Sequence, residues 1–452
     1  MQGQYKSRLN LDKAECFDTL IPDHHILRKL DQVFDLNFVR DLTISYYKAD
    51  FGRPSIDPTL FFCMLLIGYL FNIKSNRHLC EEIKYNIAYR WYCRLSLTDT
   101  IPHHSSLSRI RRRYGGSVFM TFFDKVVNLC QMHNLVGGKT LITDGMLINA
   151  NASVDSMISK NGSVTIHDKT SYSTWITSIG PKKLSNVTHV SKTDKDSTLA
   201  MKKGTSRSLK YKIHTSIDAH KRIILDNRVI TGAVHETNLY LERVAYIQNK
   251  FGLKLQNVIA DRAYGAISNI KALHAQGINA YIPLFSTRSG KSLKLAQHGY
   301  IYNKVADYYE CPAGKHLLPY KHIEQILYKI KPITCNACKK QKGCLLSRHR
   351  RTKQRYIIRS HNQEAFEQQL EFMTTPTFVA ALRERMWKIE GINAEAKNTH
   401  GLGRAKYRGL TNVQIQAYMV AAVQNLKRLI ILFFTIFIRH CNLILNDKIA
   451  NF

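Results

Sequence analysis

The N-terminal part of the chain has the apolar spacing of α-helices. The run PTLFFCMLLIGYLF at 58–71 is apolar almost throughout and follows Asp57, a candidate N-cap, so we expect a buried helix there. The next run, at 75–95, follows a candidate cap at Ser75 and repeats large apolar side chains every four residues. Together these runs predict an all-helical domain over residues 1–125.

Further along, short β-branched runs replace the helical pattern. The run at 140–151 predicts one strand, and the runs at 209–219 and 221–232, separated by a turn at His220, predict an antiparallel hairpin. Helix and strand patterns then alternate as far as residue 284. This order predicts a mixed α/β sheet with helices on its faces.

The rest of the chain interrupts the sheet and then closes it with helices. A basic, cysteine-containing segment covers 285–375, and helical patterns return at 376–397 and from about 412 onward. The apolar run LIILFFTIFI at 429–438 is too short for a helix to cross about 30 Å of hydrocarbon, so we expect a buried helix and no membrane partner. The chain is therefore predicted to consist of a helical N-terminal domain at 1–125 and the first part of a core at 126–284. An insertion at 285–375 and C-terminal helices at 376–452, which complete the core, follow.

The charge of the chain indicates a polyanionic partner. Its 452 residues contain 66 Lys and Arg against 33 Asp and Glu, a net charge of +33, while a hydrophobic content of 44% is ordinary for a globular protein. Such an excess attracts polyanions, and nucleic acid is the first candidate; a basic housekeeping protein is the alternative. The helix predicted at 103–115 carries arginines that either bind DNA or form a solvated charged face: Arg109, Arg111, Arg112 and Arg113.

Two aspartates stand in the apolar strands. Asp144 lies inside the run at 140–151, and Asp261 ends the strand NVIA and is followed directly by Arg262. A lone buried carboxylate is costly, so each should pair with a cation or a metal ion, or lie at an exposed strand end. In so basic a chain, two such acids suggest ligands for Mg²⁺ beside a phosphate backbone, where two ions can activate the attacking oxygen and stabilise the leaving one.

A third acid is available on the helix predicted at 376–397. Arg383, Glu390 and Lys397 are spaced seven residues apart, so they share a face on which a metal ligand would stand beside phosphate-binding cations. Glu395 points about 140° away from Glu390, and its neighbours one turn away on the same helix carry no charge. The alternative to a metal ligand at Glu390 is a surface helix whose charged residues pair with one another.

Four cysteines gather in the predicted insertion, in the pattern C-x23-C-x2-C-x5-C. One CxxC with two outlying cysteines can form a tetrahedral Zn²⁺ site, with His316 as a further candidate ligand; four reduced thiols are the alternative. The other cysteines are scattered and the opening residues have no apolar core, so we expect an intracellular protein with reduced thiols. The candidate zinc ligands are Cys311, Cys335, Cys338 and Cys344.

Several sequence blocks also occur in the order typical of one family. TDGMLINANAS, YKIHTSID, VITGAVHETN, IADRAYG, RMWKIEGINAEAK and HGLGRAKYRGL resemble the transposases of bacterial insertion sequences, in the DDE superfamily with an RNase H-like catalytic core. Upstream, FGRPSIDP, SNRHLCEEIKYNIAYRW and HHSSLSRIRRR resemble their helical N-terminal domain. The resemblance covers roughly residues 30–430, and it is specific because many short blocks keep the family's order.

The resemblance implies the residues of a catalytic site. The family's three acids fall on Asp144, Asp261 and Glu390. The family's glutamate motif is a basic residue, four others, Glu, six others and Lys. Its basic residue and its lysine fall on Arg385 and Lys397. The cations that the resemblance places near phosphate are Arg262, Arg385 and Lys397.

Two details of the glutamate motif stay open. Arg385 lies about 140° round an ideal helix from Glu390, so either Arg383 or Arg385 faces the site. Where relatives often carry Phe two or three residues after the Glu, this chain has Ile392 and Asn393. That departure weakens the local match and changes none of the acids.

The resemblance also implies a mechanism and partners. The expected activity is phosphoryl transfer with two Mg²⁺ or Mn²⁺ ions, which cuts the DNA ends of the element and joins the freed 3′-hydroxyls to target DNA. The expected partners are double-stranded DNA, as terminal inverted repeats and as target, and a second copy of the chain, in the bacterial cytoplasm near the nucleoid. The alternatives are a metal-dependent nuclease of the same fold that cuts without joining, and a domesticated DNA-binding protein without catalysis.

Overall fold

The computed structural model forms two compact units. The first consists of Met1–Asn238, Glu242–Leu255 and Arg385–Phe452, and the second of Leu239–Leu241 and Gln256–Glu384. These units do not coincide with the predicted domains, whose boundaries stay predictions. The structure describes the residues outside 1–18, 49–51, 53, 161–183, 202–203, 205, 286–297, 322–324, 341–343, 345, 349–354, 361 and 450–452.

The N-terminal part of the first unit is helical, as predicted. α4 is Pro58–Leu70, and the Asp57 side chain accepts hydrogen bonds from the backbone N–H groups of Thr59 and Leu60, so the predicted helix and its cap are confirmed. All of α4 except Leu60 is buried, which explains why its sequence is apolar on every side. Around it lie α2 (Ile26–Val33), α3 (Phe38–Thr43), the 3₁₀ turn η2 (Ile44–Tyr46), α5 (Asn76–Tyr85), α6 (Ile87–Tyr92) and α7 (His104–Met132).

Two of the predicted helices have different limits. The single helix expected at 75–95 is wrong: Asn86 (φ −91°, ψ 115°) separates α5 from α6 and caps α6 by accepting a hydrogen bond from the backbone N–H of Tyr89. The cap at Ser75 is confirmed, since its hydroxyl accepts a hydrogen bond from the first turn of α5. α7 extends past the predicted 103–115 by a second helical stretch, which follows a kink at Gly115, whose backbone (φ 63°, ψ −167°) is not helical.

The sheet of the first unit is built on β1 (Thr140–Asn149). This strand pairs antiparallel with β5 (Ser208–Asp218), whose other edge pairs antiparallel with β6 (Ile224–Thr231) and with the short β4 (Thr198–Ala200). The predicted strand and hairpin are therefore confirmed, and Asp144 lies in the middle of β1. The polar stretch after β1 contains the 3₁₀ turn η3 (Val154–Ser156) and the short pair β2 (Met157–Ser159) and β3 (His189–Ser191).

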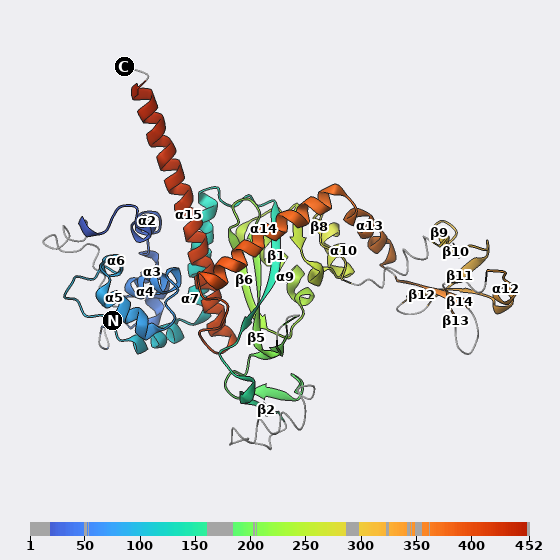
Figure 1. Ribbon diagram of the computed structural model, residues 1–452, viewed down its shortest axis with the longest axis horizontal. Coiled ribbons are helices and arrows are strands. Elements are labelled where there is room, and N and C mark those ends of the chain that lie inside the picture. The colour runs from blue at the N-terminus through green and yellow to red at the C-terminus, as the bar shows by residue number, and fades with distance from the viewer. Residues whose placement is uncertain are drawn as a thin grey trace. The chain divides into compact units, whose positions relative to one another are not determined.

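Helices cover both faces of this sheet, as the mixed α/β pattern predicts. Asp226 and Asn227 are neighbours on β6, so their side chains point to opposite faces. Arg243 of α9 (Tyr240–Phe251) binds the Asp226 carboxylate through Nε and Nη2, at 2.8 and 2.7 Å. The Asn227 amide instead donates to a backbone carbonyl of α15 (Leu410–Ile449) at 3.1 Å. α9 and α15 therefore lie on opposite sides of β6 (Figure 1).

Side-chain amides of α15 pair with the backbone along the edge of β6 that faces away from β5. Gln414 accepts a hydrogen bond from the backbone N–H of Val229 at 2.8 Å and donates to the carbonyl of Asn227 at 2.6 Å. Asn425 bonds the N–H and the carbonyl of Ile224, both at 2.9 Å. Because these residues are buried, leaving one of their backbone groups unpaired would cost about 1–3 kcal/mol. The four bonds therefore fix the position of α15 along the strand.

α15 is a core helix of the first unit. Along Leu410–Thr435 it is long and apolar enough to span a bilayer, but 67% of its most apolar window is buried inside the protein. It packs there against α7, α4, α2 and β6, and Figure 1 shows it running beside α7. The predicted burial of the run at 429–438 is confirmed as far as Ile430, whereas Ile431 is 65% exposed.

The second unit contains a short parallel pair and a larger antiparallel sheet. β7 (Asn257–Ala260) and β8 (Asn279–Tyr281) are parallel and are joined by α10 (Ile267–Ala275), in the predicted order. The predicted insertion, 285–375, folds in its described part as six antiparallel strands around a core that includes Tyr328. In sheet order these strands are β13 (Ser347–Arg348), β14 (Arg355–Ser360), β12 (Gln325–Ile330), β11 (His316–Lys321), β10 (Tyr308–Glu310) and β9 (Ile301–Asn303), with α12 (Pro332–Asn336) and α13 (Gln363–Met373) in the same unit.

We expect Asn425→Leu to lower the free energy of unfolding by about 2 kcal/mol or more, because the N–H and carbonyl of Ile224 lose their partners inside the core. Urea denaturation followed by circular dichroism measures the change. Asn412→Leu on the same helix is the matched control, since its amide donates to the carbonyl of Arg408 at the surface and its loss should cost less than about 0.5 kcal/mol. Equal losses in the two variants would contradict the role given to the amides.

Candidate active site

The Asp144 carboxylate is held by two side chains of α14 (Pro376–Asn398), which confirms the helix predicted at 376–397. Arg385 Nη2 lies 2.6 Å from Asp144 Oδ1, and Asn393 Nδ2 donates to Asp144 Oδ2 at 2.8 Å. The side chains of Asp144 and Arg385 are only 16% and 12% exposed, so little water competes for this charge-assisted bond. Both oxygens of the first predicted acid are therefore engaged by α14.

This contact decides which arginine faces the first acid. Arg385 binds Asp144, whereas Arg383 is exposed and belongs to the second unit. Asn393, the residue that departs from the family pattern, holds the other oxygen of the carboxylate. Sequence reasoning missed this role, although Asn393 lies one helical turn after Glu390 and thus on the same side of the helix.

Glu390 and Lys397 also lie on the part of α14 that belongs to the first unit. Glu390 is exposed, and Lys397 is half-buried. On an ideal helix Asn393 stands about 80° round from Arg385, and Glu390 about 60° further. On the surface of the helix, Glu390 is therefore the neighbour of Asn393, which binds Asp144.

Asp261 lies in the second unit, where it ends β7 as predicted. Its carboxylate accepts a hydrogen bond from the backbone N–H of Ala263 at 2.8 Å and caps the short 3₁₀ turn η5 (Arg262–Tyr264). Tyr264 is fully buried, with its ring centroid 4.9 Å from that of Tyr240, so this tyrosine has a packing role. Asp261 itself is half-buried on a backbone that the turn and the packed tyrosine fix.

Glu395, the other acid of this helix, is the centre of an ion-pair cluster. On α15, Lys427 Nζ lies 2.6 Å and Arg428 Nη2 2.9 Å from its carboxylate oxygens. The Gln424 amide donates to the same carboxylate at 3.1 Å, and His400 Nε2 lies 3.5 Å away. The sequence predicts no charged partner for Glu395 on its own helix, and its partners do come from elsewhere, from α15 and from the turn after α14.

This cluster connects three parts of the first unit. His400 is fully buried, and its Nδ1 lies 2.8 Å from the carbonyl oxygen of Tyr69 at the end of α4. Burial alone would raise the pKa of Glu395, but its bond to His400 and the charges of the arginine and lysine on α15 outweigh burial and lower that pKa well below its ordinary value. Glu395 is therefore a fixed anion that holds α14 against α15 and α4.

The arginines that the sequence assigns to DNA binding fall into two groups. Arg109, Arg112 and Arg113 on α7 are exposed, as is Arg262 in the second unit, which suits contacts with a phosphate backbone. Arg111 is different, because it is only 9% exposed and its Cζ atom lies 3.6 Å from the centroid of the Tyr407 ring. A solvated charged face therefore describes only the exposed arginines.

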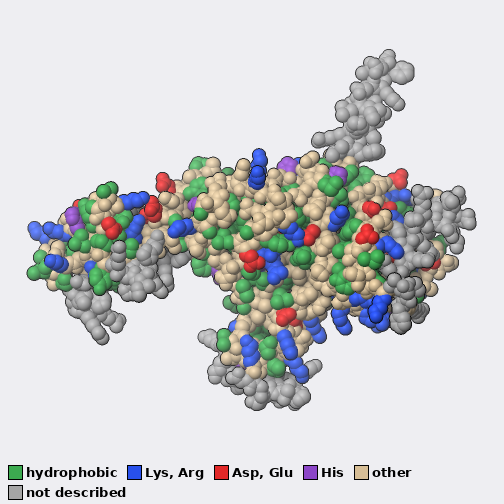
Figure 2. Space-filling model, turned by 180° about the vertical axis from the view of Figure 1, so that it is seen from behind, with side chains coloured by type: hydrophobic (Ala, Val, Ile, Leu, Met, Phe, Trp, Pro, Cys, Tyr) green, Lys and Arg blue, Asp and Glu red, His purple; other side chains and the backbone are tan. Residues whose placement is uncertain are grey.

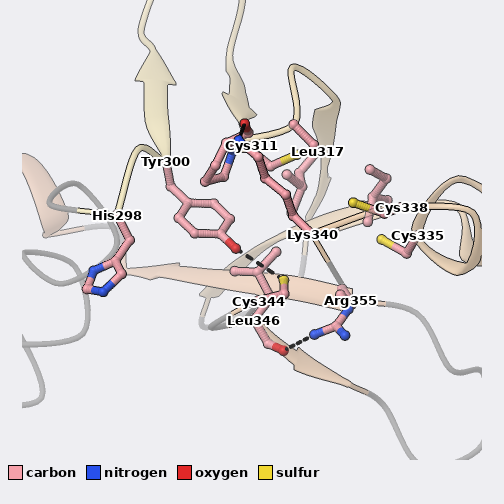
Figure 3. Close-up of a pocket in the computed structure, with 13 residues that line it drawn as sticks. His298, Tyr300, Cys311, Leu317, Cys335, Cys338, Lys340, Cys344, Leu346 and Arg355 are labelled. Carbon is pink, nitrogen blue, oxygen red and sulfur yellow. Dashed lines mark hydrogen bonds between the residues drawn. The ribbon is translucent and has the colours of Figure 1, made fainter. Parts of the chain in front are cut away.

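The four cysteines of the second unit line one cavity of about 330 Å³ (Figure 3). Cys335 and Cys338 lie close together at α12, and the Cys344 thiol is 3.1 Å from the Tyr300 hydroxyl. All four, Cys311 included, are free thiols. Burial raises the pKa of the Cys335 thiol, and the other three thiols raise it further, whereas a nearby arginine lowers it. The other three thiols therefore lie within electrostatic range of Cys335.

No metal-binding arrangement is formed by the side chains that the structure describes: no three His, Cys, Asp or Glu residues are grouped so that they could hold an ion. This applies to the cysteines and to the acids alike. The predicted ligands of Mg²⁺ and Zn²⁺ are thus supported by the chemistry of their donor atoms, and not by a completed coordination geometry.

Two family models match the chain. One describes a transposase domain (DUF772) and matches residues 15–113, which include the helices from α2 to the first turns of α7. The other describes a transposase DDE domain and matches residues 310–430, which include all of α14 with Glu390 and the start of α15. No curated protein matches the chain.

Several solved transposase structures resemble this chain weakly. The piggyBac transposase synaptic complex with hairpin DNA is 12% identical, with a TM-score of 0.31 over 100% of this chain and 87% of that chain. The Mos1 transposase paired-end complex with the left transposon end is 12% identical, with a TM-score of 0.17 over 62% and 77%. The pre-cleavage Mos1 transpososome is 10% identical, with a TM-score of 0.17 over 62% and 78%. TM-scores this low carry no structural argument.

We expect Glu395→Gln to lower the free energy of unfolding by about 3 kcal/mol at neutral pH, because Lys427 and Arg428 would keep their charges inside the protein without an anion. Glu371→Gln on α13 is the control, since this exposed carboxylate should change stability by less than about 0.5 kcal/mol. Urea denaturation of the three proteins in parallel measures both values.

The same variant gives a pH dependence. The folded-state pKa of Glu395 lies below its ordinary value of 4.5, so its contribution is fully present above that value and is lost as the pH falls toward the folded-state pKa. The stability difference between the native protein and Glu395→Gln should stay constant from about pH 8 to pH 5 and shrink below about pH 4.5. A difference that shrinks toward alkaline pH instead would contradict this role.

Proposed function

This chain belongs to the DDE transposases, and we propose that it cuts the DNA ends of its element and joins them to target DNA by metal-dependent phosphoryl transfer. The observation that carries the proposal is the Asp144 carboxylate in the middle of β1, held by Arg385 and Asn393 of the helix that also carries Glu390. The residues proposed as the first acid, the basic residue and the glutamate of the site, Asp144, Arg385 and Glu390, belong to one unit, which supports the proposal.

The proposed ligands of the divalent ions are Asp144, Asp261 and Glu390. Their carboxylate oxygens are the hard ligands that Mg²⁺ prefers, and Mn²⁺ accepts the same donors. When bound, two such ions would neutralise the negative charge that develops on the attacking and leaving oxygens.

The side chains around Asp144 contribute position and charge. Arg385 and Asn393 engage both oxygens of the carboxylate, so the first acid is already oriented before DNA binds. Arg385, with Lys397 on the same helix, also supplies positive charge that can stabilise a phosphate. Arg262 would do the same beside Asp261, which it follows directly in the chain.

DNA is the partner that the charge of the chain supports. Lys and Arg outnumber Asp and Glu by 66 to 33, and Figure 2 shows Lys and Arg spread over the visible face, several of them along its lower edge. The exposed Arg109, Arg112 and Arg113 of α7 would contact backbone phosphates. Because two ends of an element must be cut and joined together, we infer a homodimer on the terminal inverted repeats, in the bacterial cytoplasm.

The catalytic core is proposed to be RNase H-like. The antiparallel order of β1, β5 and β6, with the first acid on β1, supports this fold, as does the parallel pair β7 and β8 that follows with the second acid. The six-stranded sheet of 285–375 would then be an insertion between that pair and the glutamate helix.

Substituting any of the three acids should remove catalysis and spare DNA binding. We expect Asp144→Asn, Asp261→Asn and Glu390→Gln each to slow cleavage of terminal-repeat DNA by at least about a hundredfold. Affinity for the same DNA should change by less than about twofold, because it depends on Lys and Arg contacts to phosphates. Single-turnover cleavage with Mg²⁺ and a gel-shift titration measure the two effects.

Two control variants sharpen this test. Glu371→Gln should cleave normally, and Glu395→Gln, assayed at a temperature where it stays folded, should lose less than about tenfold in rate. Near-native cleavage by any of the three acid variants would overturn the assignment of that acid. A native protein that only nicks DNA, without a strand-transfer product, would be a nuclease, and one that binds without cutting would be a DNA-binding protein.

For the cysteine cavity we propose a structural Zn²⁺ ion. Four free thiols line one cavity, and two of them stand at tight backbone turns, where Gly314 N–H donates to the carbonyl of Cys311 at 2.8 Å and Cys338 N–H to that of Cys335 at 3.2 Å. Because the thiols do not converge on one point, binding an ion would have to draw them together.

Elemental analysis of the purified protein should give about one zinc per chain, and Cys335→Ser or Cys338→Ser should reduce this value to near zero. Cys80→Ser is the matched control, because this thiol lies in the first unit and should leave the zinc content unchanged. A protein that contains no zinc and whose four thiols all react with a thiol reagent in the native state would overturn the proposal.

A further inference from the structure

A second cavity, in the first unit, is lined by several cations and, in its described lining, by no carboxylate. It has a volume of about 400 Å³ and lies where the end of α4, the starts of α5 and α7, and the segment after α14 meet. This volume is in the range of small-ligand sites, about 300–1,000 Å³. No Asp or Glu is among the described residues that line it, and its basic lining residues are Lys74, Arg77, His104, Arg111 and Lys406.

Arg111 is buried in this cavity with part of its guanidinium unpaired. Within the described chain its Nε and Nη1 atoms are buried and have no hydrogen-bond partner, although its Cζ atom lies 3.6 Å from the centroid of the Tyr407 ring. Arg243, by contrast, is paired with the Asp226 carboxylate, and the buried Arg90 donates to several backbone carbonyls. A buried charge is costly unless it is paired, so an anion in the cavity would stabilise Arg111.

Lys406 is a second cation of the cavity, and it is half-buried. Its Nζ atom donates to the carbonyl of Ile73 at 3.0 Å and lies 4.6 Å from the centroid of the Tyr69 ring. Burial lowers the pKa of Lys406 to about 8, whereas a nearby carboxylate would have raised it. Lys406 and Arg111 thus line the same cavity with positive charge that no carboxylate of its described lining neutralises.

Two helices begin at this cavity. α5 starts after the cap at Ser75, and α7 starts at His104. The two starts are joined where Asn76 Nδ2 donates to Ser108 Oγ at 3.2 Å. The N–H groups of a first helical turn and the helix dipole both favour an anion, so the backbone adds to the field of the cations.

We propose that this cavity binds a phosphate group of the DNA backbone, as a subsite separate from the three acids. The inference rests on the proposed function, because it takes DNA as the ligand. The Arg111 guanidinium offers a planar fork of donors that matches phosphate oxygens, and Lys406 offers a second charge. A volume of about 400 Å³ leaves room for the sugar attached to the phosphate.

Backbone contacts fix the cavity at the far end of β1. Asn149 N–H donates to the carbonyl of Gly403 at 3.1 Å, and Ala405 N–H donates to the carbonyl of Asn149 at 2.8 Å, just before Lys406. Asn149 is five residues beyond Asp144 on the strand, about 16 Å at the rise of a β-strand. A phosphate in the cavity is therefore a different one from the phosphate at Asp144, and binding it would set the register of the DNA strand.

The first experiment measures binding of a terminal-repeat duplex by fluorescence anisotropy in EDTA, so that neither metal ions nor cleavage enter the result. We expect Lys406→Met to weaken binding about tenfold at about 100 mM salt and to reduce the slope of log affinity against log salt by about one. Lys406→Arg should restore most of both. Lys84→Met, an exposed lysine at the other end of α5, is the matched control and should bind like the native protein.

The second experiment uses inorganic phosphate as the probe and compares it with chloride at equal ionic strength. Phosphate should raise the thermal unfolding midpoint of the native protein and not those of Arg111→Met or Lys406→Met. Removing an unpaired buried cation of similar size should leave the midpoint without phosphate unchanged or raised, which separates loss of the ligand from loss of the fold.

The outcomes distinguish the sources of the anion. Weaker DNA binding by Lys406→Met, and by Arg111→Met in the same anisotropy assay, with intact folding, supports the subsite. A phosphate effect without any change in DNA affinity would assign the cavity to a free phosphate compound and overturn the proposal, as would the absence of both effects. A native protein that binds DNA but never cuts it would overturn the proposed function and leave this test valid.

Discussion

The first unit depends on how the outer edge of β6 is buried. A strand edge inside a protein presents backbone N–H and carbonyl groups that must find partners, and here the amides of Gln414 and Asn425 provide them. Because an amide both donates and accepts, each side chain satisfies two groups of the strand. α15 cannot slide along β6 without breaking these buried bonds. The apolar residues of α15 drive its burial, and the amides determine where along the strand it lies.

Polar contacts connect α15, through α14, to the candidate acid Asp144. Lys427 and Arg428 of α15 bind Glu395 of α14, and two other side chains of α14 bind Asp144 on β1. β1 is in turn connected through β5 to β6, on which α15 is fixed. The contacts therefore form a closed ring of β6, α15, α14, β1 and β5. In such a ring a shift of one element is opposed by all the others, so the Asp144 carboxylate keeps its orientation although no single contact is unusually strong.

The sequence predicts the features whose causes are local. The Asp57 cap of α4, the β5–β6 hairpin and the place of Asp261 at the end of β7 all follow from residues within a few positions. The break between α5 and α6 was missed because the apolar spacing continues across Asn86. The contact of Asn393 with Asp144, 249 positions away, and the partners that α15 gives to Glu395 have no local signal. Only the fold brings those groups together.

A strongly basic chain raises the question of which cations determine its specificity. Exposed arginines such as Arg109 act through a field that salt screens, and composition alone predicts that field. Buried cations are more informative, because each must be compensated or remain costly. Those paired with acids hold the fold together: Arg243 with Asp226, Arg385 with Asp144 and Arg428 with Glu395. Among the described residues Arg111 and Lys406 have no such anion, yet the rings of Tyr407 and Tyr69 and the carbonyl of Ile73 hold them in place around a cavity. A fold that keeps positive charge in so fixed a position favours a ligand that carries the missing negative charge, and a transposase meets that charge in every nucleotide of its substrate.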